Sequence, residues 1–134
     1  MRKIRSLGIV AAMLIWSCSC RDQKDSAENA LDAGREFVRG VLDGDYIKAE
    51  TYLLKDSVNL DLFRKQQIND QTLSEEQKRK NRESSIRPLS ITPTNDSTTL
   101  FRYYHSANPS DTTTLRIIRQ EGHWLVDLKS ILKP

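Results

Sequence analysis

The chain has 134 residues, of which 37% are hydrophobic and 29% charged, with five Gly, four Pro and two Cys; this composition indicates one small globular domain and argues against a disordered, collagen-like or disulfide-rich chain. The net charge is +3, but three of the 21 basic residues, Arg2, Lys3 and Arg5, precede the only long apolar run, and removing them leaves 18 basic against 18 acidic residues. A charge-balanced domain has no basic field to attract nucleic acid, so we expect no nucleic-acid partner.

Residues 1–17 have the pattern of a secretory signal peptide. Ten uncharged and mostly apolar residues (LGIVAAMLIW) follow the positive start and precede the small polar run SCSC. Spanning a bilayer as a helix takes about 20 apolar residues, so this run is too short for a permanent anchor. We therefore expect residues 1–17 to be removed and to take no part in the fold.

The end of this leader resembles the lipobox of bacterial lipoproteins. In that motif an aliphatic residue stands three positions before a Cys and a small residue stands directly before it; Ile15 and Ser17 hold these positions relative to Cys18. The resemblance implies that Cys18 is lipidated, with Cys20 as the alternative. A disulfide between the two would be strained because one residue separates them, and no Cys or His cluster offers the further ligands that a metal needs.

The next segment predicts a tether and then a helical hairpin. Residues 18–25 are polar and unpatterned, so we expect a short linker before a folded domain of residues 26–134. Small and apolar residues recur at helical spacing over residues 27–42, which predicts a long amphipathic helix. Gly44 is suited to end this helix, and Asp45 to cap a second one.

Two further helices are predicted before residue 82. Asp56 is an N-cap signal for a third helix, and Ser74 is one for a fourth, although polar residues dominate this stretch and leave its helical register undefined. The basic run of residues 78–80 is interpreted as a solvated helix end. The alternative, a contact with phosphate or anionic lipid, is disfavoured because acidic neighbours neutralise the run: Glu75, Glu76 and Glu83.

After residue 82 the hydrophobic period changes from 3.6 to 2, which predicts strands. The expected strands span residues 86–92, 98–105, 112–120 and 123–129, with a loop at 108–111. Pro88 removes a backbone donor from the first of them and so indicates an edge position or a bulge. Helices followed by an antiparallel sheet predict the α+β class, with N-terminal helices packed on a bent four-stranded sheet.

The hairpin at Glu121-Gly122 fixes the pairing of the last two strands, with Gln120 opposite His123. This register places six residues on the core side: Leu115, Ile117, Arg119, Trp124, Val126 and Leu128. On the outer side Arg116 lies opposite Asp127, and we expect a solvated ion pair there that contributes well under ~1 kcal/mol. In the preceding strand Phe101 and Tyr103 are assigned to the core, because the other assignment would bury Arg102 unpaired.

Two phrases of the sequence carry a family resemblance: LDGDYIKAETYLLKDS and GHWLVDL. Together with the lipoprotein leader they resemble the family labelled domain of unknown function 4878, small lipoproteins of Gram-negative bacteria in the nuclear-transport-factor-two-like, cystatin-like superfamily. The resemblance implies a cone in which a bent sheet wraps a long helix and can leave a pocket at its open end. It also implies a lipid anchor in the cell envelope, at the outer membrane, facing the periplasm or the cell surface.

Four side chains are candidates for lining such a pocket: Tyr103, His105, Arg119 and Trp124. We expect no carboxylate in the interior, because Asp127 is assigned to the outer face, and His105 is interpreted as a solvated histidine at a strand end. No phosphate-binding glycine loop, catalytic triad or metal-ligand spacing is found in the sequence, so no catalytic residue, metal or cofactor is predicted.

The predicted function is a lipid-tethered, non-catalytic module that binds a small molecule or an envelope protein. Two alternatives stay open. The first is a pocket enzyme of the isomerase or hydratase type, in which His105 or Tyr103 would titrate abnormally. The second is a structural homodimer that mates through Ile118 and Leu125 on the outer face of the sheet.

Overall fold

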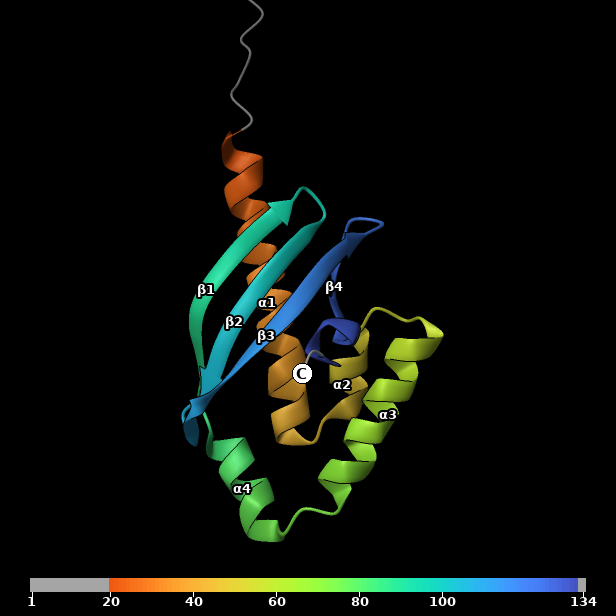
Figure 1. Cartoon of the computed structure of the whole chain (residues 1–134), viewed down its shortest axis with the longest axis vertical. Helices are drawn as coiled ribbons and strands as arrows, with labels where there is room; N and C mark the ends of the chain where they lie inside the picture. The colour runs from red at the N-terminus through yellow and green to blue at the C-terminus, as the bar shows by residue number, and fades with distance from the viewer. Residues whose placement is uncertain (1–19, 133–134) are drawn as a thin grey trace, which may run out of the picture.

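The computed structural model describes residues 20–132; the predicted signal peptide and Cys18 lie outside these residues. Within them the chain forms helices first and an antiparallel sheet afterwards (Figure 1), which confirms the predicted α+β class. The helices are α1 (Cys20–Asp43), α2 (Tyr46–Thr51), α3 (Ser57–Gln71) and α4 (Glu75–Glu83). The strands are β1 (Ile86–Asn95), β2 (Thr98–His105), β3 (Asn108–Gln120) and β4 (His123–Asp127), and the 3₁₀ helix η1 (Leu128–Leu132) follows.

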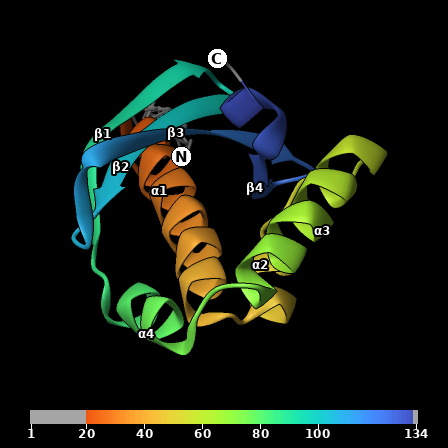
Figure 2. The same cartoon turned by 60° about the horizontal axis from the view of Figure 1, so that its bottom comes forward.

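Helix α1 begins at Cys20, seven residues before the predicted start at residue 27. Residues 20–25, predicted as an unpatterned tether, are therefore helical, and the segment contains neither the Gly nor the Pro that would break a helix. The helix crosses the concave face of the sheet (Figure 2). Gly34 permits the close approach, because a Cβ there would lie 2.7 Å from Ile117 Cδ1 and 2.8 Å from Phe101 Cδ1.

The predicted helix caps are confirmed. Gly44 adopts a φ of 74° between α1 and α2, and the Asp45 side chain accepts a hydrogen bond from the Lys48 amide. Asp56 and Ser74 cap α3 and α4 in the same way, accepting from the amides three residues further along the chain. Each cap satisfies backbone donors that a helix start leaves free, which is why these local signals predict the helix starts well.

The basic run of residues 78–80 lies inside α4, because that helix continues to Glu83. Lys80 pairs with Glu76 at 3.2 Å, and Lys78 lies 3.5 Å from Glu75. The side chains of this run are exposed or partly exposed. The run is solvated as predicted, but its placement at a helix end was wrong, because α4 continues three residues beyond it.

The sheet has the order β1-β2-β3-β4. Gln120 pairs with His123 and Arg119 with Trp124, as predicted, and the turn residues Glu121 and Gly122 have φ values of 52° and 79°. Positive φ at both positions is the geometry of a type I′ hairpin, whose twist matches that of the strands. In β1 the pairing register shifts after Pro88, which confirms the predicted bulge in an edge strand.

Three strand boundaries differ from the prediction. Strand β1 continues to Asn95 and does not end at residue 92, with a register shift between Pro93 and Asn95. Residues 108–111, predicted as a loop, belong to β3, where the pairing skips from Asn108 to Thr112. Pro109 lies in this irregularity, so its missing N–H costs the ladder no hydrogen bond. Strand β4 ends at Asp127 and not at residue 129, because Asp127 turns the chain into η1: its carboxylate accepts from the Lys129 amide at 3.2 Å and its carbonyl accepts from Ser130 Oγ at 3.0 Å.

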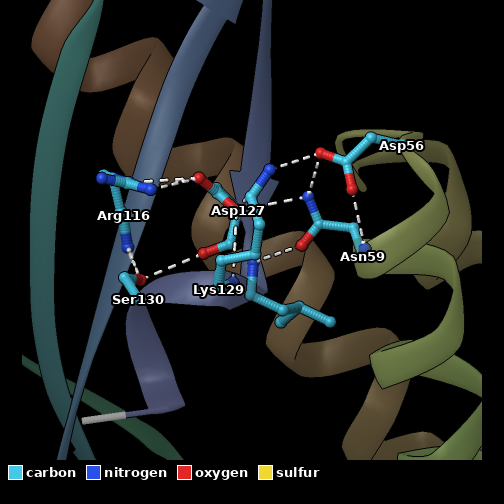
Figure 3. A network of polar contacts seen from close by, with 7 residues as sticks. Asp56, Asn59, Arg116, Asp127, Lys129 and Ser130 are labelled. Carbon is cyan, nitrogen blue, oxygen red and sulfur yellow. Dashed lines mark hydrogen bonds and ion pairs between the residues drawn. The ribbon is translucent and has the colours of Figure 1, made fainter.

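Asp127 also corrects the prediction of a solvated ion pair. Its side chain is only 1% exposed, and its carboxylate accepts hydrogen bonds from Arg116 and Asn59 (Figure 3). The N-terminal end of α3 brings Asn59 onto this end of the hairpin, and the Asn59 side chain also accepts from the Leu128 amide at 2.8 Å. Burial by α3 and η1 converts an outer-face pair into an internal network.

Lys129 and Asp56 close the network at the surface, with Lys129 Nζ 2.5 Å from Asp56 Oδ2 and 3.8 Å from Asp127 Oδ1. The hydrogen bond from Lys129, together with that from the Asn59 amide, lowers the pKa of Asp56. The same contact raises the pKa of Lys129. The contact between Asp56 and Lys129 thus favours the ionised form of both groups, and it links the start of α3 to η1.

One hydrophobic core joins α1 to the sheet. Phe37 and Val38 of α1 are buried in the same cluster as Phe101 of β2 and Trp124 of β4. Thr99, Phe101 and Tyr103 are buried while Arg102 is exposed, which confirms the predicted face of β2.

Candidate functional site

A cleft of about 390 Å³ opens between the C-terminal half of α1, the helices α3 and α4, and the ends of β2 and β3. Seven of its thirteen lining residues are apolar, and they include Phe37, Val38, Leu115, Leu128 and Ile131. Its polar groups come from the sheet on one side and from α3 and α4 on the other: Tyr103, His105, Thr113, Gln66, Asp70 and Asn81. Apolar walls with a few converging polar groups are typical of small-molecule sites.

The sheet supplies Tyr103 and His105, two of the predicted pocket residues. They lie two residues apart on β2 and therefore share one face, with their ring centroids 5.3 Å apart in an edge-on arrangement. Tyr103 also stacks on Phe101 at 5.0 Å. The two polar rings are thus held in fixed positions at the end of an aromatic row.

Both rings are neutral at pH 7. Burial raises the pKa of Tyr103 to about 12. Burial lowers the pKa of His105, and the positive charge of Arg39 adds to this while Asp111 opposes it. The interpretation of His105 as a solvated histidine was wrong, because the ring is half-buried and its Nδ1 has no hydrogen-bond partner among the residues that the structure describes.

The helical side supplies Asp70, a carboxylate that the sequence analysis did not place in the interior. Its Oδ2 accepts a hydrogen bond from the Tyr46 hydroxyl at 2.6 Å. Burial, followed by the contact with Asp70, raises the pKa of Tyr46, so the phenol stays protonated as the donor. The expectation of an interior without carboxylates was therefore wrong.

The sequence carries a weak signal for the inner face of α3. Asn59 and Phe63 are buried, and Gln66 and Asp70 line the cleft; these four positions recur at spacings of four, three and four, which place them on one side of a helix. Three of the four are polar, so hydrophobic periodicity does not reveal this face. Phe63 is the only aromatic residue in α3, and its position could have indicated which side of the helix faces the core.

Three aromatic rings hold α3 in place and so define the cleft. Phe63 lies 6.0 Å from Phe37 of α1 and 5.9 Å from Tyr46 of α2, measured between ring centroids. A second cleft of about 350 Å³ adjoins the first and shares four lining residues with it: Val41, Leu42, Asp70 and Asn81. The space between α1 and the α3–α4 arm is therefore accessible from more than one side.

Arg119 and Trp124, the other two predicted pocket residues, do not join Tyr103 and His105. They line a separate groove of about 1050 Å³ between α1, residues 51–55 and the β3–β4 hairpin. The register explains the separation, because Arg119 lies beside Ser97 at one end of β2, whereas His105 lies at the other end. The single predicted pocket is thus corrected to two sites, and Arg119 is solvent-exposed at the rim of its groove.

In the part of the chain that the structure describes, no group of three or more His, Cys, Asp or Glu side chains is arranged to hold a metal ion. None of the described helices is both long enough and apolar enough to cross a membrane. Comparison of the chain with protein-family models, with curated proteins and with solved structures finds no match. The resemblance to the domain of unknown function 4878 family therefore stays a prediction.

Proposed function

We propose that this protein is a binding module whose cleft between α1, α3, α4 and the sheet holds a small, largely apolar ligand. The observation that carries the proposal is that Tyr103, His105 and Asp70 line one cleft together with seven apolar side chains. Aromatic and aliphatic walls gain free energy by covering apolar ligand surface, while the few polar groups orient the ligand through hydrogen bonds.

A binding role is favoured over catalysis because the carboxylate of Asp70 is already hydrogen-bonded to Tyr46. The Tyr46 hydroxyl donates a hydrogen bond to Asp70 Oδ2 at 2.6 Å, so one of the two carboxylate oxygens is already engaged within the protein. An isomerase or hydratase is the second candidate, favoured by the presence of Asp70 and His105 on the same cleft. Proton transfer predicts that a ligand co-purified with the protein gains deuterium at carbon in D₂O and that Asp70→Asn stops this; a binding module leaves the ligand unlabelled.

Cleft binding is tested by filling the space. Val41 lines both clefts and is partly exposed, so Val41→Trp should occupy the space without replacing a fully buried side chain. Ile47→Trp on α2 is the matched control, because Ile47 is 85% exposed. Titration with a neutral apolar dye such as Nile red should show at least about a tenfold loss of affinity for the first variant only, equivalent to about 1.4 kcal/mol. Equal dye affinity in both variants would contradict the proposal.

We also propose that the module is held at the outer membrane through a lipid on Cys18, as the lipobox resemblance implies. Helix α1 begins two residues after Cys18 and is 24 residues long, which corresponds to about 36 Å at 1.5 Å per residue. The cleft, at the C-terminal half of α1, would then lie far from the lipid. A homodimer remains the third candidate, supported by the partial exposure of Ile118 and Leu125, which pair on the outer face.

A further inference from the structure

We propose that the free edge of β4 at Trp124 accepts an extended polypeptide segment by strand addition, in the groove that separates this edge from α1. This site is distinct from the ligand cleft and does not depend on it. The proposal rests on the direction of backbone groups along β4, on which of them are already paired, and on the groove beside the one that is not.

The first step is the direction of the Trp124 backbone. The Val126 N–H donates to the Tyr52 carbonyl at 2.7 Å, and the Val126 carbonyl accepts from the Leu54 N–H at 2.9 Å, so both groups of Val126 point away from β3. In an antiparallel pair the side to which a residue directs its backbone groups alternates from one residue to the next. Trp124, two residues before Val126, therefore also directs its N–H and carbonyl away from β3.

The second step is the state of this edge. Residues 52–54 cover it at Val126, where Leu53 forms a parallel bridge, and the Asn59 side chain covers the Leu128 N–H. Among the described residues, no hydrogen bond from outside the β3–β4 pair reaches the Trp124 backbone. Residues 52–54 thus pair with β4 at Val126. Trp124, the preceding residue that faces away from β3, is left without such a partner.

The third step is the space beside Trp124. The groove of about 1050 Å³ is lined by this residue, by the exposed Asn29 and Asp32 of α1, and by Thr51 and Tyr52 before the bridge. Its charges nearly balance, with Asp32, Glu36 and Glu121 against Lys55 and Arg119, and Glu36 is paired with Lys48. A strongly charged ligand of either sign is therefore not favoured.

The chemistry of the open edge selects the partner. One residue of an extended chain presents an N–H and a carbonyl on the same side, and these match the carbonyl and N–H of Trp124. Main-chain pairing of this kind supplies affinity with little dependence on sequence, while pockets beside the edge select side chains. We infer that the partner is a neutral, extended peptide segment with β-branched residues, which favour that conformation.

The open edge is tested first without a partner, by amide hydrogen exchange in the folded protein. The Trp124 amide should exchange at least about 100-fold faster than the Val126 amide, because only the latter is hydrogen-bonded. Both lie on the same strand and face the same side, so the comparison controls for global unfolding. Equal protection of the two amides would overturn the proposal.

Partner binding is then tested with a blocked peptide of alternating Thr and Val between terminal Lys residues. It should slow exchange at Trp124 at least about tenfold at saturation, with a Kd no weaker than about 1 mM. The same peptide N-methylated at every residue keeps its side chains but loses the N–H donors on both edges, so it should not bind.

Groove-filling variants complete the test. Asn29→Trp places a large side chain in the groove and should abolish peptide binding, whereas Arg35→Trp, at an exposed position of α1 outside the groove, should not. Absence of binding up to about 1 mM, or equal binding of the N-methylated peptide, would overturn strand addition at this edge.

Discussion

The buried carboxylate of Asp127 leads to the sharpest stability prediction. Its Oδ2 accepts from Arg116 Nε at 3.1 Å and Nη2 at 2.6 Å, and its Oδ1 accepts from Asn59 Nδ2 and from the Lys129 amide, both at 3.2 Å. All four groups that contact the carboxylate are hydrogen-bond donors, so the side chain at position 127 must offer an acceptor at both of its terminal atoms. Asp127→Asn keeps the shape of the side chain but, in either orientation of the amide, turns an NH₂ group toward two donors.

The expected cost is substantial because Asp127 and Asn59 are buried, although the Arg116 side chain is 40% exposed and can turn toward water. Breaking a fully buried ion pair by removing one partner costs about 3–5 kcal/mol; because Arg116 is partly exposed, we expect a smaller cost here, about 1–3 kcal/mol, from the buried donors that lose their acceptor. Total stabilities of small domains are about 5–15 kcal/mol, so this single change should remove a substantial part of the free energy of unfolding. Because the substitution is nearly isosteric, no cavity contributes to the loss, and the effect reports on the polar network alone.

Urea denaturation measures the effect. Asp127→Asn should lower the midpoint with an unchanged m-value, since the surface exposed on unfolding stays the same. Asp61→Asn on α3 is the matched control, because its partner Lys65 lies at 2.7 Å but both side chains are more than 60% exposed; it should cost less than about 0.5 kcal/mol. A cost below about 1 kcal/mol for Asp127→Asn would refute the buried network and restore the solvated pair expected from sequence.

Three further predictions concern packing, pH and anchoring. Gly34→Ala should destabilise the fold by about 1–3 kcal/mol in thermal or urea unfolding, because the new Cβ would lie 2.7 Å from Ile117 Cδ1; an unchanged midpoint would contradict the close approach. The pKa of Tyr103 is raised to about 12 from about 10 in the unfolded chain, so the folded state holds a proton that the unfolded state loses, and stability should fall as pH rises from about 10 to about 12. The pKa of Tyr46 is raised as well, so Tyr103→Phe should reduce this slope without abolishing it, and a slope unchanged by Tyr103→Phe would contradict the assignment to Tyr103. Cys18→Ser should leave the protein unprocessed or soluble in membrane fractionation, whereas the same outcome for Cys20→Ser alone would move the lipidation site.

The local features of this protein are predictable because their causes lie within a few residues. Asp45, Asp56 and Ser74 cap helices through amides three residues away, and the Glu121-Gly122 turn sets the β3–β4 register by its own backbone geometry. The α+β class follows from the change of hydrophobic period after the helices. These conclusions do not require knowledge of the tertiary contacts between helices and strands.

The buried network at Asp127 and the composition of the cleft and the groove depend on tertiary structure. Asp127 is buried only because α3 and η1 pack over the hairpin, and Asp70 faces a cleft only because Phe63 holds α3 against α1 and α2. Such contacts join residues far apart in sequence, so no local pattern records them. The amino-acid sequence by itself determined the elements, their ends and one strand register through short-range hydrogen bonds and side-chain periodicity; the burial of charge and the separation of cleft from groove arise from long-range packing, which only the folded chain defines.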